Sequence, residues 1–217
     1  MNDRYDIRIV LESDTLIGSG EGFGAVIDND IVFDELGLPY IPAKRIKGCL
    51  RQSAEEVNDM LALSGIAQKF DLDSIFGKPG NEESAPVFFH NLYLVGYENF
   101  RNWLKYYLDW EEWKQFLSPE IILDYFTALR QQTAIDEEKG IAKEHSLRTS
   151  RLLRKGISFI GEINIIPKDK RTIDALSLAC RNFRYIGTRR NRGFGKITCE
   201  LLKNSSPLPI AILEETE

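Results

Sequence analysis

Cysteine and histidine are scarce in this 217-residue sequence, which holds three cysteines and two histidines. The cysteines, Cys49, Cys180 and Cys199, lack the spacing of metal ligands, and their odd number argues against a disulfide framework. With so few of these residues, a zinc site is not expected. Apolar runs long enough for a transmembrane helix are absent as well, and the charged N-terminus lacks the apolar segment of a secretion signal. We therefore expect a cytoplasmic protein that does not contact a membrane.

Disorder is not expected either, because hydrophobic residues make up 43% of the chain and charged residues 28%. The length suffices for one large domain with a buried core. We expect a single domain over residues 1–202 and a loose tail over residues 203–217.

Acidic residues outnumber basic ones, giving a net charge of −5 that by itself argues against a nucleic-acid partner. Their distribution is uneven, however, because three segments contain basic residues and no acid. The longest lies between Asp174 and Glu200, the second spans residues 44–51 and the third spans residues 148–155. Because a polyanion responds to the local potential, an acidic protein can still carry a basic groove. The alternative is that each segment is only a solvated face.

The hydrophobic pattern changes between the strand period and the helix period along the chain. Strands are predicted at residues 5–13, 87–95, 157–166 and 196–202, and helices at residues 43–63 and 172–184. This order is the βαββαβ arrangement of a ferredoxin-like (RRM-like) core in the α+β class. Residues 97–132 form a helical, aromatic-rich insertion whose rings we assign to the core, and the polar residues 133–155 form a projecting, thumb-like hairpin. The fold alone assigns no function.

The first of the two core helices is predicted to begin with several cations. Lys44, Arg45 and Lys47 lie in or beside its first turn, where positive charge opposes the helix dipole and costs up to ~1 kcal/mol per exposed cation. Gly48 in the helix interior costs about 1 kcal/mol relative to alanine. Both costs are explained if an anion binds the free amides and these cations, while a ligand packs close to Gly48. Arg51 extends this candidate RNA-binding set. The alternative is a poorly capped helix without a ligand.

A second basic segment combines glycines, arginines and one aromatic ring. Its glycines let backbone amides approach a ligand, its arginines bind phosphates in a bidentate manner, and its ring offers a stacking face. The candidate residues are Gly187, Arg189, Arg190, Arg192, Gly193, Phe194 and Gly195. This combination suits a single-stranded nucleic acid, whereas a P-loop would need a Gly-Lys-Ser/Thr run at the start of a helix. The alternative is a basic surface turn.

A third glycine-rich segment, residues 18–24, follows the first predicted strand. It is similar to a dinucleotide-binding fingerprint, but no helix opens after it and the strand–helix–strand context is missing. We interpret it as a flexible loop that places Asp28 or Asp30 near a backbone.

These segments together resemble the RAMP superfamily of CRISPR-associated proteins, and specifically the subunits of type III effector complexes. The resemblance rests on residues 37–51 (GLPYIPAKRIKGCLR), 75–77 (IFG), 133–142 (TAIDEEKGIA) and 187–195. It implies an RRM-like core that lines up with other type III Cas subunits, and with copies of itself, along a CRISPR RNA. The segment 133–155 would be the thumb that presses between the bases of guide and target RNA. The Lys-Arg variant of the first motif points toward type III-D, as a backbone or capping subunit.

The resemblance also implies roles for particular residues. The cations at residues 44–47 would hold the guide backbone, and so would the loop around residues 189–192. Backbone subunits of this family often cut target RNA with an aspartate and a divalent metal such as Mg²⁺. Asp28 falls at the place of that aspartate and is the candidate catalytic residue and metal ligand, with Asp30 as the competing choice. The alternative is that both aspartates lie in a solvated turn.

Two other functions remain as hypotheses. A repeat-RNA processing endoribonuclease of the same superfamily would act without a metal, by general acid–base chemistry. Its candidate bases are His90, whose apolar neighbours favour a structural role in a strand, and His145 in the projecting segment. A metabolic enzyme on the same core lacks support, because the sequence shows no nucleophile–base pair and no metal cluster.

Overall fold

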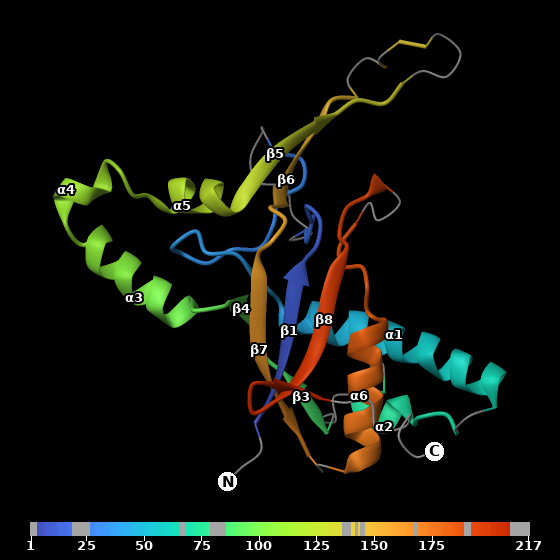
Figure 1. Ribbon diagram of the computed structural model, residues 1–217. Coiled ribbons are helices and arrows are strands. Elements are labelled where there is room, and N and C mark those ends of the chain that lie inside the picture. The colour runs from blue at the N-terminus through green and yellow to red at the C-terminus, as the bar shows by residue number, and fades with distance from the viewer. Residues whose placement is uncertain are drawn as a thin grey trace.

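The computed structural model describes residues 4–18, 27–65, 68–78, 86–135, 140–141, 143, 146–166, 169–188 and 192–208. The strands are β1 (Tyr5–Leu11), β2 (Tyr40–Ile41), β3 (Val87–Phe89), β4 (Leu92–Leu94), β5 (Thr127–Gln132), β6 (Arg148–Leu153), β7 (Ser158–Ile165), β8 (Ile197–Lys203) and β9 (Ser206–Pro207). The helices are α1 (Ala43–Ser64), α2 (Leu72–Phe76), α3 (Tyr97–Leu108), α4 (Glu111–Lys114), α5 (Pro119–Phe126) and α6 (Lys170–Asn182). Figure 1 shows a central sheet with a hairpin and a helical arm projecting from it.

The strand order confirms the predicted ferredoxin-like core in the α+β class. The seven-stranded antiparallel sheet has the order β2-β4-β7-β1-β8-β9, and β3 also pairs with β7. β1 therefore lies between β7 and β8, and the second core strand, split into β3 and β4, lies beyond β7. With α1 after β1 and α6 after β7, the chain follows the βαββαβ path.

α1 and α6 pack together on one face of this sheet (Figure 1). Ile7 and Ile9 of β1 are fully buried, and the Ser53 hydroxyl of α1 donates a hydrogen bond to the Ala179 carbonyl of α6 at 2.8 Å. The residues that alternate with them in β1 point to the other face, where Arg8 pairs with a carboxylate of β8. The period-two pattern of the sequence is thus the pattern of burial along the strand, except that Asp6 is also buried.

The predicted strand over residues 87–95 is interrupted, and this corrects the sequence expectation. Its two halves pair with β7 at Phe89–Ile163 and at Tyr93–Ile160. The four residue steps from Phe89 to Tyr93 therefore lie opposite three steps on β7, so the strand contains a β-bulge of one extra residue. The bulge brings the Asn91 carbonyl so close that a Cβ at position 161 would lie 2.6 Å from its oxygen, and Gly161 is the residue that fits there.

The helical insertion ends earlier than the predicted residue 132. Residues 127–132 form β5, which pairs antiparallel with β6 from Thr127–Leu153 to Gln132–Arg148. α5 ends at Phe126, and the next residue, Thr127, has an extended conformation (φ −127°, ψ 167°) and caps the helix. The projecting hairpin thus includes β5 and begins before residue 133.

Most aromatic rings of the insertion lie outside the core, which also corrects the sequence expectation, although Tyr97 and Phe126 pack against the core. Every residue of α3 and α4 is described, and none is buried. The large exposed side chains there and in the adjoining segments are Phe100, Trp103, Tyr106, Trp110, Trp113 and Phe116. These helices form an arm beside the sheet (Figure 1), where rings pack against one another instead, as Tyr107 and Trp113 do at 5.4 Å.

The segment expected to be a loose tail begins within the sheet, because Lys203 ends β8 and Ser206–Pro207 forms β9 beside it. Residues from 209 onward lie outside the described part of the chain. The three cysteines are free thiols, as expected. None of the described helices has the length and apolar character needed to cross a lipid bilayer.

Candidate nucleic-acid interface

The start of α1 has the cationic first turn that the sequence predicts. Its N-cap residue, Pro42, offers no side-chain hydrogen bond, and no acidic residue lies in the first turn. The amides are less free than expected, because Ala43 donates to the Asn91 side chain at 2.9 Å and Arg45 donates to the Pro42 carbonyl at 3.0 Å. Nothing in the sequence pattern indicated this role of Asn91. An anion here would therefore bind side chains more than backbone.

Two of the predicted cations have no ion-pair partner among the described residues. Lys44 is exposed and Lys47 half-buried. Arg45, in contrast, donates to the Gly18 carbonyl at 2.7 Å and holds the end of the segment that follows β1. Gly48 is exposed, and no atom of the described chain would lie within 4 Å of a Cβ there. The close approach expected at Gly48 is thus not made by the protein itself.

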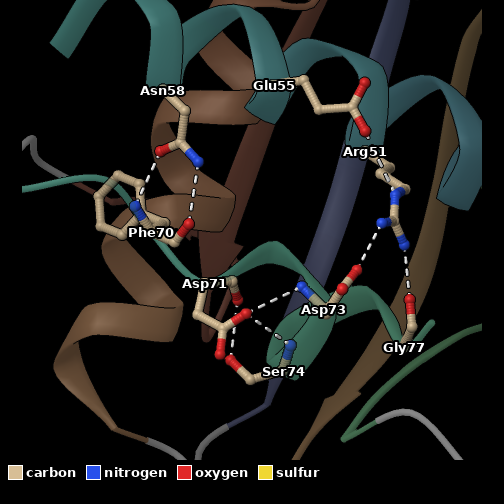
Figure 2. Close-up of polar contacts among 8 residues, drawn as sticks. All are labelled: Arg51, Glu55, Asn58, Phe70, Asp71, Asp73, Ser74 and Gly77. Carbon is tan, nitrogen blue, oxygen red and sulfur yellow. Dashed lines mark hydrogen bonds and ion pairs between the residues drawn. The ribbon is translucent and has the colours of Figure 1, made fainter. Parts of the chain in front are cut away.

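Arg51, like Arg45 and unlike Lys44 and Lys47, is bonded to other described residues of the protein. Its guanidinium donates to Asp73 at 2.6 Å and to the Gly77 carbonyl at 2.5 Å, and it also reaches Glu55 at 3.3 Å (Figure 2). The same view shows Asn58 of α1 paired with the backbone of Phe70. Arg51 therefore joins α1 to α2 and to the IFG turn, which is a structural use of a residue predicted to bind RNA.

The start of α1 and the C-terminal glycine-rich loop meet on the same short segment, residues 14–18. Gly187 has φ +84°, and a Cβ there would lie 2.1 Å from the Leu16 carbonyl oxygen. The amide of Thr188 donates to the same carbonyl at 3.2 Å, and that of Gly195 donates to Asp14 at 3.0 Å. Because Arg45 also contacts this segment, at the Gly18 carbonyl, two basic segments far apart in the sequence lie close together in the structure.

The described part of the glycine-rich loop is only partly as predicted. Arg192 and Gly193 are exposed, whereas Arg189 and Arg190 lie outside the described residues. The Phe194 ring is 8% exposed, and the Arg130 guanidinium of β5 lies 5.6 Å from its centre. This ring therefore does not offer the open stacking face expected of it. Nothing in the sequence pattern indicated a role for Arg130, because its segment has a helical pattern.

The two candidate aspartates occupy different environments beside the hairpin. Asp28 accepts a hydrogen bond from Arg148 at 2.7 Å and from the Thr149 amide at 2.8 Å. The Arg148 guanidinium, and then this amide, hold the pKa of Asp28 below its usual value, so the carboxylate is ionised at neutral pH. Asp30 is 3% exposed and forms an ion pair with Arg151 at 3.1 Å. Asp28 is the more accessible carboxylate.

A divalent metal fits this site only through a single protein carboxylate. No group of three or more acidic, histidine or cysteine side chains occurs among the described residues. Mg²⁺ commonly uses one or two carboxylates and completes its shell with waters and substrate phosphates. Asp28, which is ionised and exposed to solvent, fits the role of that one ligand.

The histidines weighed for metal-free chemistry are placed as follows. His90 is exposed in the bulge, with a ring nitrogen 3.1 Å from the Asn164 side-chain amide of β7. His145 lies outside the described residues.

Comparison with known proteins agrees with this architecture. The family model of the RAMP superfamily matches residues 8–198. A subunit in the apo cryo-EM structure of a Type III-B Cmr-beta has a TM-score of 0.63 at 14% identity, covering 92% of this chain and 97% of its own. A subunit in the structure of Type III-B Cmr-beta bound to cognate target RNA gives 0.64 at 14% identity, covering 93% and 97%. No curated protein sequence matches.

Proposed function

The chain belongs to the RAMP superfamily, and we propose that it is an RNA-binding subunit of a type III CRISPR interference complex, where it holds the backbone of the guide RNA. One observation carries this proposal: Lys44 and Lys47, at the start of α1, have no ion-pair partner among the described residues, and Arg45 beside them contacts the same segment, residues 14–18, as the C-terminal glycine-rich loop. Cations that gain phosphate partners release counterions, which supplies much of the affinity for a nucleic-acid backbone.

The comparisons support the choice of partners. The similar structures are Type III-B Cmr-beta assemblies, one of them bound to cognate target RNA. We therefore propose that other type III Cas subunits, the guide RNA and a target RNA are the partners of this chain. Copies of the same chain are a further candidate partner. The assignment of this chain to type III-D stays a prediction.

The guide-binding proposal is tested in the assembled complex. The variant Lys44→Glu/Lys47→Glu, purified through a tag together with its partners, should carry at least fivefold less short RNA per complex than the unmodified chain. The matched control is Lys69→Glu/Lys105→Glu, which changes the net charge equally at two exposed lysines outside this surface. If both variants carry the same amount of guide RNA, the proposal fails.

We propose further that Asp28 serves as the metal-binding carboxylate for cleavage of the target RNA. Its support is its exposure and its lowered pKa; because the folded-state pKa lies below the ordinary ~3.9, the carboxylate is lost to protonation only in strong acid. Asp28→Asn should abolish target cleavage while target binding stays within about twofold. EDTA should have the same effect as the substitution.

The control for cleavage is Asp30→Asn, whose carboxylate is buried and ion-paired. Cleavage that depends on Asp30 and not on Asp28 would contradict the assignment. Cleavage of repeat RNA in the presence of EDTA would instead favour the processing endoribonuclease.

A further inference from the structure

The third basic segment of the sequence, residues 148–155, divides into two parts in the structure. Arg148 pairs with Asp28, and Arg151 pairs with Asp30 and with Asp124 of α5 at 2.8 Å. Arg154 and Lys155 are exposed, and neither side chain has a partner among the described residues. The segment thus presents two free cations just beyond the end of β6, at the root of the hairpin.

These two cations border a groove of about 810 Å³, here called the thumb-base groove. The residues that matter for its chemistry are Val95, Phe100, Tyr125, Arg154, Lys155 and Ile157. They come from the end of β4, the first turn of α3, the end of α5 and the turn before β7. The volume falls within the range of about 300–1,000 Å³ typical of small-ligand sites. No acidic side chain of the described residues lines the groove.

The groove combines flat apolar surface with positive charge. Tyr125 is 77% exposed and Phe100 is 48% exposed, so both rings are open to a ligand. The Phe100 ring lies over Gly96, the left-handed residue that precedes α3, where an added Cβ would be 3.6 Å from the ring. A purely apolar partner would cover Arg154 and Lys155 without compensating their charge, which is costly.

We propose that the thumb-base groove binds an unpaired nucleotide of a single-stranded RNA, with its base against Phe100 and Tyr125 and its phosphate at Arg154 and Lys155. Every unit of a single strand offers a flat base and an anion together, which is the pair of features that this groove can bind. An acidic peptide would match the charge, but it supplies no regular flat surface for the rings.

The position of the groove indicates how one strand reaches two sites. β6 runs from the partner of Asp28 to the edge of the groove, and the five residue steps from Thr149 to Arg154 span roughly 17 Å. An RNA that follows this strand passes from the candidate cleavage carboxylate to the groove. The inference takes RNA as the ligand from the function proposed above, but its site is separate from the start of α1.

The test uses the full chain, a single-stranded RNA oligonucleotide that carries 4-thiouridine, and mass-spectrometric mapping of the crosslinks. We expect a crosslinked peptide that contains Tyr125, both in the unmodified chain and in Lys44→Glu/Lys47→Glu. In anisotropy titrations of that charge-reversed background, Phe100→Ala/Tyr125→Ala should weaken binding about tenfold. Arg154→Ala/Lys155→Ala should reduce the slope of log affinity against log salt by about 1.4, the value for two lost phosphate contacts.

The matched controls are Trp103→Ala/Trp113→Ala and Lys105→Ala/Lys114→Ala, which remove rings and cations from the same arm outside the groove. Crosslinks that map elsewhere, or groove variants that bind RNA as these controls do, would overturn the inference. The proposed function is tested separately, by the guide content of the complex. Guide content that is insensitive to Lys44→Glu/Lys47→Glu, with the Tyr125 crosslink intact, would overturn the proposed function alone. A partner protein crosslinked in the groove in place of RNA would also overturn the inference.

Discussion

Asp28 and Asp30 are two residues apart, yet the structure gives them different tasks. Asp28 lies at the surface beside Arg148, whereas Asp30 is buried and joins the segment after residue 27 to Arg151 of β6. Arg151 also pairs with Asp124, so one guanidinium connects the hairpin to α5 and to the loop. The exposed Asp28 carboxylate accepts bonds from Arg148 and from the Thr149 amide, whereas the buried Asp30 carboxylate joins this loop to β6.

This difference predicts opposite effects on stability and activity. Asp30→Asn leaves the largely buried Arg151 with one carboxylate fewer, and loss of one partner from a buried ion pair costs about 3 kcal/mol. We expect urea denaturation to show a loss of that size for Asp30→Asn and a free energy of unfolding close to that of the unmodified chain for Asp28→Asn. Equal losses in the two variants would contradict the assignment of roles.

At the scale of elements, the arm formed by α3, α4 and α5 is the most unusual part of the fold. Its aromatic rings contact one another, as Trp103 and Tyr107 do at 6.0 Å, but most remain in contact with solvent. Truncating a ring that is exposed in the folded state removes little buried apolar area, so it costs little folding free energy. The stability of the chain therefore resides mainly in the sheet, its two covering helices and the buried Ile122 and Leu123 of α5.

A comparison of two aromatic truncations tests this division. Trp103→Ala should change the free energy of unfolding by about 0.5 kcal/mol, because Trp103 is 65% exposed. Phe159→Ala in β7 should cost about 3–5 kcal/mol, because that ring is fully buried and its loss leaves a cavity. Thermal or chemical denaturation of the full chain measures both, and a large loss for Trp103→Ala would show that the arm contributes to the core.

At the scale of the whole molecule, the sequence predicted the core well, because both of its signals are local. Alternation in β1 and the apolar face of α1 each arise within a single element. The structure confirms the alternation except at Asp6, which is buried, and α1 buries Ile46, Leu50 and Val57 while Met60 is half exposed. The strand β5 was missed because its identity depends on pairing with β6, which lies well beyond it in the sequence. Long-range pairing of this kind overrides the local helical pattern.

The segments of the candidate site were predicted from the sequence, but the ion pairs and ring contacts among their side chains were not. Composition and spacing identified the start of α1 and the glycine-rich loop, and the structure brings them together through residues 14–18. Spacing could not show that Arg51 is paired with Asp73, or that Phe194 lies beneath Arg130. The sequence alone does not show whether a basic or aromatic side chain faces solvent or contacts a partner within the protein.

The hairpin of β5 and β6 completes its own ladder of backbone hydrogen bonds. Its inner part is joined to the remainder of the chain by the reciprocal backbone bonds between Thr15 and Leu153 at 2.9 and 2.8 Å, by bonds of residues 28–29 with Thr149 and Arg151, and by the ion pairs of Arg151. Because the hairpin is not part of the large sheet, a change in the length of its outer part leaves the register of that sheet unchanged. The reach of the projecting segment can therefore change in length while the scaffold beneath it stays constant.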